Sequence, residues 1–122
     1  MKQILAVGLG GFVGSITRYS LGKWILKMSN GFFPFQTILI NVIGCFMIGL
    51  LTPKIEAFSS NRLFLSEFVL IGLLGGFTTF SAFGLEVIFL FKQNQIFYAG
   101  IYIVSSLILG CLAVYIGLLI NY

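Results

Sequence analysis

Long apolar stretches follow one another along the chain, separated by short polar links. Hydropathy marks four of them, at residues 4–26, 34–51, 63–91 and 96–120. Each is close to the roughly 20 apolar residues that an α-helix needs to cross a bilayer. The pair Thr52-Pro53 predicts the end of the second helix, because proline disfavours helix continuation. We therefore predict an all-α membrane protein, with residues 1–122 forming a single four-span membrane domain.

The third stretch differs from the others in its length and in its polar middle. As one continuous helix, residues 63–91 would be about 43 Å long, against roughly 30 Å of hydrocarbon. Its middle, residues 75–83, reads GGFTTFSAF. Glycine permits non-helical backbone, and hydroxyl side chains can satisfy the freed backbone groups. We predict a break near residues 75–79. Irregular backbone at that depth is tolerated only inside protein or beside a wet cavity, so the break marks the working part.

Composition agrees with a membrane protein. The chain is 59% hydrophobic and 8% charged, with a mean hydropathy of +1.10, well outside the range of soluble domains. The first stretch carries Arg18 and lacks a small-residue cleavage site, so we interpret it as a span rather than a signal peptide. Basic residues are scattered over the links, which is typical of lysines at lipid headgroups and not of a nucleic-acid surface. Cys45 and Cys111 lie in apolar stretches, where a thiol usually packs.

The loop charges do not decide the orientation in the membrane. Four spans place both termini on one side, and the six basic residues of the links then divide equally, with Arg18 inside the first span left unallocated; counting it would favour one side by a single charge. One side has Lys2, Lys54 and Arg62, and the other has Lys23, Lys27 and Lys92. The positive-inside rule gives no preference between them. Two interpretations stay open: a weak bias selects one orientation, or copies insert both ways and pair antiparallel.

Polar side chains recur on single faces of two spans. Thr37, Asn41 and Gly44 share one face of the second span, and Tyr102 and Ser106 share one face of the fourth. Such groups commonly bond neighbouring membrane helices. The Asn41 amide can also donate two hydrogen bonds to an anion without adding a charge. Both interpretations stay open on spacing alone.

Several other residues have a structural and a functional interpretation. Gly10 and Gly14 fit the small-xxx-small pattern of closely packed membrane helices, since no βαβ context supports a nucleotide loop. Arg18 either extends toward headgroups or attracts anions to an aqueous vestibule. Glu86 either marks a functional site within the span or lies near a solvated helix end. These alternatives are not separated by the sequence.

Phe80 follows the expected break, and Phe83 lies on the same helical face. The chain has 14 phenylalanines, so packing is the starting assumption for either ring. An aromatic ring nevertheless carries positive potential along its edge and can solvate a small anion edge-on. Weak solvation at several positions is what ion conduction requires, because the ion must also leave.

Three motifs together resemble one known family. They read GFVGSITRY at residues 11–19, NVIG at residues 41–44 and GGFTTFSAF at residues 75–83. This sequence closely resembles the fluoride channels called Fluc or CrcB over essentially the whole chain. The resemblance implies a dual-topology, antiparallel homodimer in the bacterial plasma membrane, with two narrow pores. It implies passive export of fluoride, which lowers cytoplasmic fluoride, with chloride excluded.

The resemblance also implies roles for individual positions. Asn41 would be the polar pore residue, and Phe80 and Phe83 would line each pore. Gly75 and Thr78 would supply backbone carbonyls to a structural sodium ion at the dimer centre. Other expected positions are Arg18 at the vestibule, a polar lining of Thr37, Ser81, Glu86, Tyr102 and Ser106, and Gly110 where the family can have a hydroxyl.

Other functional classes fit the sequence less well. A proton-coupled exporter resembling the small multidrug-resistance family would need a carboxylate in its first span, where this chain has Arg18 and no acid. A scaffold subunit would not explain a polar break in the third span. No nucleophile–base pair, metal cluster or cofactor motif indicates an enzyme.

Overall fold

The structure, a computed structural model, describes residues 1–29, 31–57 and 62–121. Its helices are α1 (Lys2–Met28), α2 (Phe35–Ala57), α3 (Arg62–Leu65), η1 (Ser66–Leu74), α4 (Gly75–Phe77), α5 (Phe80–Lys92) and α6 (Ile96–Leu119). Four helical stretches are long and apolar enough to cross a membrane: Lys2–Met28, Phe35–Ala57, Arg62–Lys92 and Ile96–Leu119. The prediction of an all-α protein with four spans is confirmed.

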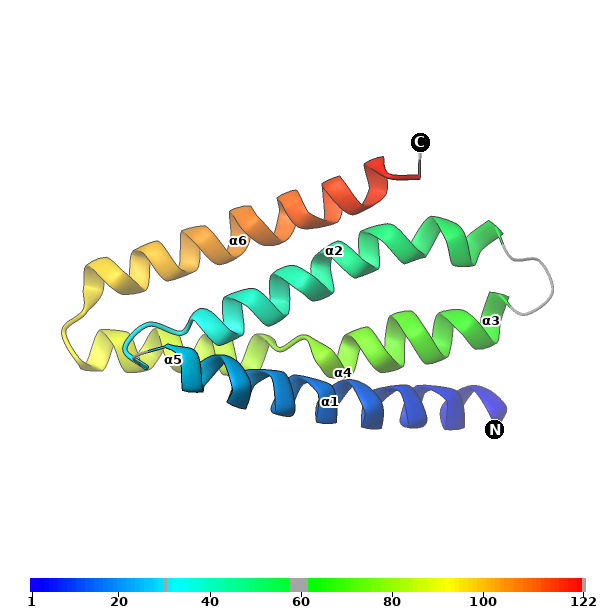
Figure 1. The fold of residues 1–122 in the computed structure, drawn as a ribbon, viewed down its shortest axis with the longest axis horizontal. Helices are drawn as coiled ribbons and strands as arrows, with labels where there is room; N and C mark the ends of the chain where they lie inside the picture. The colour runs from blue at the N-terminus through cyan, green and yellow to red at the C-terminus, as the bar shows by residue number, and fades with distance from the viewer. Residues whose placement is uncertain (30, 58–61, 122) are drawn as a thin grey trace.

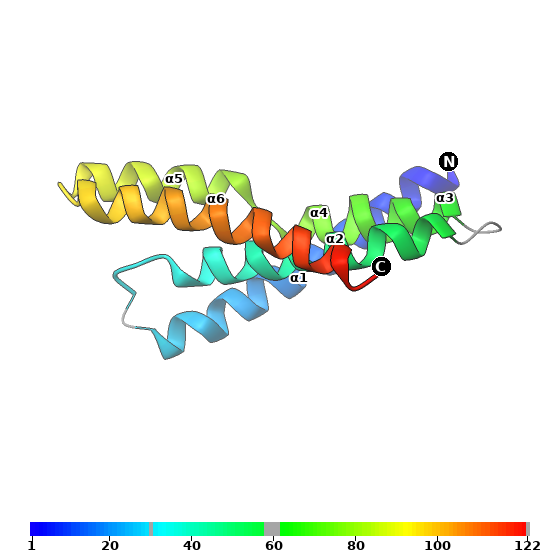
Figure 2. The same ribbon diagram turned by 90° about the horizontal axis from the view of Figure 1, so that it is seen from above.

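The elements form an elongated bundle with both termini at one end (Figure 1). The end of α2 and the start of α3 lie at that same end. Before the break, the third span packs along α1 through η1 and α4. After the break, α5 packs against α6, and Figure 2 shows this pair set apart from α1. The break thus lets one span change its packing partner halfway across the bundle.

The break lies where the sequence predicts it, at Thr78 and Thr79. Both residues are extended, with φ −80° and ψ 159° at Thr78 and φ −149° and ψ 120° at Thr79. Gly75 is itself helical, with φ −63° and ψ −38°. The conformational freedom of Gly75 therefore does not produce the break, which lies at Thr78 and Thr79. Its neighbour Gly76 instead permits close packing, because a Cβ there would lie 2.7 Å from the Gly11 carbonyl oxygen.

The predicted close packing of α1 is also confirmed. A Cβ on Gly10 or Gly14 would overlap backbone atoms of η1. The facing helix uses glycine as well, since a Cβ on Gly72 would lie 2.7 Å from the Val7 carbonyl oxygen. Small residues on both helices let their backbones approach. This contact fixes the first half of the third span against α1.

Two features of the helices were not predicted. The sequence analysis ends the second span at Thr52-Pro53, which is wrong: α2 continues through Pro53 to Ala57. A proline at position 53 removes one helical hydrogen bond, the one that the Gly49 carbonyl would accept, and membrane helices tolerate such a loss when the freed group is satisfied by other means. In addition, Ser66–Leu74 forms a π-helix, a rare form that is frequent at functional sites.

Candidate functional site

A central cleft of about 330 Å³ lies beside the break. Three of the four spans line it: α2, the third span on both sides of the break, and α6. It is lined by Asn41, Gly44, Cys45, Ile48, Leu70, Leu74, Gly75, Thr78, Thr79, Phe80, Phe83, Ser106, Leu107 and Gly110. The structure therefore brings seven of the expected positions together: Asn41, Gly75, Thr78, Phe80, Phe83, Ser106 and Gly110.

Asn41 holds the break with both ends of its amide. Its Nδ2 donates to the Thr79 carbonyl at 3.0 Å, and its Oδ1 accepts from the Thr79 N–H at 2.8 Å. An extended residue inside a helical span leaves backbone groups without helical partners, and in hydrocarbon these must be satisfied. Asn41 satisfies both groups of Thr79. An amide nitrogen carries two N–H donors, so one of them remains for a further acceptor in the cleft.

Thr79 starts the next helix, a role that the sequence analysis did not assign. Its hydroxyl oxygen accepts from the Ala82 N–H at 3.2 Å, which makes it the N-cap of α5. Threonine is a preferred N-cap residue, so a threonine just after an expected break was the available signal. Ser81 is exposed, with its hydroxyl 3.3 Å from that of Thr79. Ser81 therefore lies beside the central cleft and not among the residues that line it.

The same hydrogen bonds release two carbonyl groups. In an unbroken helix the Thr79 N–H would bond to the Gly75 carbonyl and the Ala82 N–H to the Thr78 carbonyl. Here those two donors go to the side chains of Asn41 and Thr79. Gly75 is exposed, and no heavy atom lies within 4 Å of the position a Cβ would take. Gly75 thus presents its backbone on an open face of the molecule.

Glu86 is held by groups on two other helices. Its carboxylate accepts from the Thr37 hydroxyl at 2.8 Å and from the Tyr102 hydroxyl at 2.6 Å. The Gln36 amide adds a longer bond at 3.4 Å. Thr37 and Tyr102 are buried, so these two bonds are shielded from the surroundings of the protein. Both carboxylate oxygens of Glu86 are therefore bonded within the protein.

Gln36 is a second residue that sequence reasoning missed, although a further polar residue next to Thr37 was a signal. It lines a smaller hollow of about 170 Å³ together with Glu86 and Gln93. Among the residues that the structure describes, its Oε1 is buried without a hydrogen-bond partner. The Glu86 carboxylate is thus reached from this hollow, on the side away from the central cleft.

The two phenylalanines connect the central cleft to the Glu86 group. The Phe80 ring is 82% exposed, and its centroid lies 5.5 Å from that of Phe83. The Phe83 ring in turn lies 5.1 Å from the Tyr102 ring. Ser106 lies one helical turn after Tyr102, and its hydroxyl is buried without a partner within the described part of the chain. Ser105 instead bonds to the Tyr102 carbonyl and faces away from the cleft.

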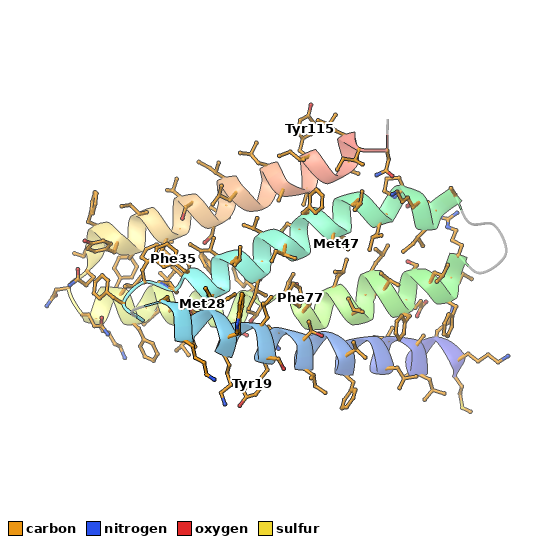
Figure 3. The ribbon with its side chains drawn as sticks, viewed as in Figure 1. Tyr19, Met28, Phe35, Met47, Phe77 and Tyr115 are labelled. Atoms are coloured by element: carbon orange, nitrogen blue, oxygen red, sulfur yellow. The ribbon has the colours of Figure 1, made fainter. Side chains whose placement is uncertain are left out.

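Arg18 lies on the inner side of α1. It follows Gly14 by one turn, so the two share the face that packs on the third span, and it is half-buried. Its neighbour Tyr19 points away from the other helices (Figure 3), where the Lys23 ammonium lies 5.1 Å from its ring centroid. Arg18 is therefore placed beyond the point where the third span leaves α1.

Known proteins are similar to this chain over nearly its whole length. The family described as CrcB-like protein, Camphor Resistance (CrcB), matches residues 5–118. A fluoride-specific ion channel FluC from Rhizobium etli is 45% identical over 98% of this chain and 96% of its own length. Proteins of the same name from Methylobacillus flagellatus and Ruminiclostridium cellulolyticum are 41% and 38% identical, over 96% of this chain and 92% and 90% of their own lengths. The chain belongs to the CrcB family of membrane proteins.

Proposed function

We propose that this protein is a passive, fluoride-selective channel of a bacterial plasma membrane that lowers cytoplasmic fluoride. The observation that carries the proposal is the grouping of Asn41, Phe80 and Phe83 around one cleft at the helix break. Among the described residues, those that line the cleft supply an amide, hydroxyl groups and aromatic rings, and none of them is acidic. That chemistry suits a small anion, and it occurs in a relative of proteins named fluoride-specific ion channels.

The cleft offers weak contacts in series. One N–H of Asn41 remains for an anion, and the Phe80 and Phe83 ring edges supply positive potential. The Ser106 hydroxyl adds a donor without a competing partner in the described chain. None of these groups carries a charge, so none traps the ion, and conduction needs sites that bind weakly enough to release. Fluoride, the smallest halide, gains most from close contact with such donors.

Beyond the rings, the Glu86 group forms the next part of the proposed path. The hydroxyl groups of Tyr102 and Thr37 both donate hydrogen bonds to the Glu86 carboxylate. An arriving anion can accept a hydrogen bond from one of these hydroxyl groups only if that group gives up its bond to the carboxylate. The Glu86 carboxylate therefore determines where the two donors are positioned. Arg18 lies on the inner face of α1, and its charge raises the local concentration of anions at a vestibule.

A second copy of the chain would complete each pore. Phe80 is 82% exposed and Gly75 lies on an open face, although both belong to the same cleft. An aromatic ring exposed beside polar backbone suits protein contact better than lipid. An antiparallel partner would place its own break against this one and form two equivalent pores, consistent with the equal division of loop charges.

The released carbonyls suit a sodium ion at the centre of such a dimer. Among the described residues, no group of three acidic, histidine or cysteine side chains could hold a metal. Carbonyl oxygens are hard ligands that coordinate Na⁺ in membrane proteins with discontinuous helices. Gly75 and Thr78 of each copy would hold the ion, whose charge would attract anions to the nearby pores. We expect dimers purified without sodium to dissociate more readily, and added Na⁺ but not K⁺ to restore them.

The function is tested by ion release from liposomes containing the purified protein. A potassium ionophore is added to vesicles loaded with potassium fluoride or potassium chloride, and external anion is followed with ion-selective electrodes. We expect rapid fluoride release and retained chloride. Equal release of the two anions, or release of neither, would refute the proposal.

A further inference from the structure

We propose that the Cys45 thiol is a hydrogen-bonding position on the ion path, at the end of the central cleft where Gly110 supplies no side chain. The inference rests on the proposed fluoride channel and extends it to a residue for which the sequence analysis gave only packing. Cys45 lines the cleft with Asn41, one helical turn earlier on α2. The two side chains therefore lie on the same face, one above the other.

The polar face of α6 stops before the cleft does. Tyr102, Ser106 and Gly110 follow one another at intervals of four residues and share one face. The first two carry hydroxyl groups, whereas Gly110 lines the cleft with backbone alone. A Cβ built on Gly110 would lie 3.5 Å from the Cys45 sulfur, an ordinary contact distance. The thiol thus stands where a side chain at position 110 would reach.

The Cys45 thiol lies next to the position where Gly110 offers no side chain. The aliphatic side chains that line the cleft are those of Ile48, Leu70, Leu74 and Leu107. The Ser106 hydroxyl, one turn away on the facing helix, is itself buried without a partner among the described residues. A buried hydroxyl without a partner among the described residues, with a thiol lining the same cleft, suits a ligand that binds briefly better than permanent packing.

The weak hydrogen bond that a thiol donates suits this position. The S–H group is a neutral, weak donor, so it stabilises an anion less than a hydroxyl does and releases it readily. Cys111 provides a matched comparison, because it follows Gly110 directly on α6 but is exposed and does not line the cleft. Both cysteines are free thiols, and only Cys45 faces the proposed path.

The first test replaces the thiol and restores a polar group from the other helix. We expect Cys45→Ala to lower the initial fluoride efflux rate about threefold, the loss of one weak hydrogen bond, and Cys45→Ser to retain the rate. Adding Gly110→Ser to Cys45→Ala places a hydroxyl in the space that the sulfur vacates and should restore efflux. Cys111→Ala should behave as the parent. A Cys45→Ala protein that forms normal dimers and conducts at the parental rate would overturn the inference.

The second test modifies the thiol in the assembled channel. Methyl methanethiosulfonate transfers its CH₃S group to the cysteine: a new S–S bond forms, the reagent's S–S bond breaks, and methanesulfinate leaves while the thiol proton passes to water. We expect this reagent to reduce efflux by the Cys111→Ala channel and to leave the Cys45→Ala channel unaffected. Mass spectrometry reports which cysteine carries the added group.

Two results of this experiment contradict the inference. One is parental efflux by protein whose Cys45 is fully modified, and the other is a Cys45 that stays unmodified in the parent channel while Cys111 reacts. Failure of the proposed function itself looks different. In that case the unmodified parent protein releases no fluoride, before any cysteine is changed.

Discussion

At the scale of single residues, Asn41 combines two tasks that the sequence left as alternatives. Its amide bonds both backbone groups of Thr79, so it braces the break as helix-bonding asparagines do. The same amide lines the central cleft and keeps one N–H. The hydrogen bonds that brace the break therefore also fix the donor in the orientation that an anion would meet.

The ring pair is tested by replacing each aromatic side chain with an aliphatic one. We expect Phe83→Ile to lower fluoride efflux at least about tenfold, because an aliphatic side chain offers no positive ring edge to the ion. Phe80→Ile should act in the same direction. Phe91→Ile is the control, since Phe91 belongs to α5 but does not line the central cleft. Efflux is compared at equal dimer content. If Phe83→Ile conducts at the parental rate, the Phe83 ring has only a packing role.

Asn41 is tested by separating stability from conduction. Asn41→Ala leaves two backbone groups of Thr79 without partners, and we expect it to lower the free energy of unfolding by about 1–3 kcal/mol. Asn41→Asp keeps the acceptor for the Thr79 N–H but places a negative charge in the cleft, so efflux should fall more than stability does. Asn121→Ala removes bonds to Leu50 and Gly117 outside the cleft and serves as control. Detergent unfolding and efflux are measured on the same preparations, and normal efflux by Asn41→Asp would contradict the assignment.

At the scale of elements, the broken span is positioned by glycine on one side and by polar bonds on the other. Gly10 and Gly14 fit against η1, which in turn presents Gly72. After the break, α5 leaves α1, and Glu86 is bonded to α2 and α6. The two halves of the span are thus anchored to different helices, which holds the released carbonyls and the ring pair in fixed places.

The glycine contact is tested with a single methyl group. A Cβ on Gly14 would overlap the Leu73 carbonyl, which is backbone and cannot rotate away. We expect Gly14→Ala to lower the free energy of unfolding by about 1–3 kcal/mol, the range for overpacked sites, and to reduce efflux by displacing the break. Gly8→Ala is the matched control on the same helix, because nothing lies within 4 Å of its Cβ position. Equal detergent unfolding of the two variants would contradict the packing argument.

Much of this architecture could be predicted from the sequence. Apolar length predicted the four spans, and the polar run at residues 75–83 predicted the break, because both features depend on residues close together in the chain. The roles of Gln36, Thr79 and Cys45 were not predicted, since they arise where segments far apart in sequence meet. The π-helix of Ser66–Leu74 has no distinguishing residue pattern. Pro53 misled the prediction because a proline removes only one helical hydrogen bond, and α2 continues past it to Ala57.

At the scale of the whole molecule, the cleft opens onto a face that this chain alone does not cover. Phe80 and Gly75 are exposed there, beside the break and its released carbonyls. With Arg18 inside α1 left out, the links at each end of the bundle carry three basic residues, and both termini lie at one end. A pair of oppositely inserted copies is consistent with both features.

The membrane orientation is tested with reporters on the C-terminus. Green fluorescent protein fluoresces only in the cytoplasm and alkaline phosphatase works only outside it, and we expect both fusions to be active. A variant with Gln3→Lys and two lysines appended after Tyr122 should tip the charge balance and retain only the fluorescent signal. Activity of a single reporter in the unaltered chain would contradict dual topology.

Selectivity is measured most directly as a reversal potential in a planar bilayer. With a tenfold fluoride gradient, equal chloride on both sides and an impermeant anion for balance, a fluoride-selective channel reverses about 59 mV from zero, the Nernst potential of a monovalent ion. The account predicts a value close to that limit, unchanged when a chloride gradient is added. A reversal potential near zero under the fluoride gradient, or one that follows chloride, would contradict it.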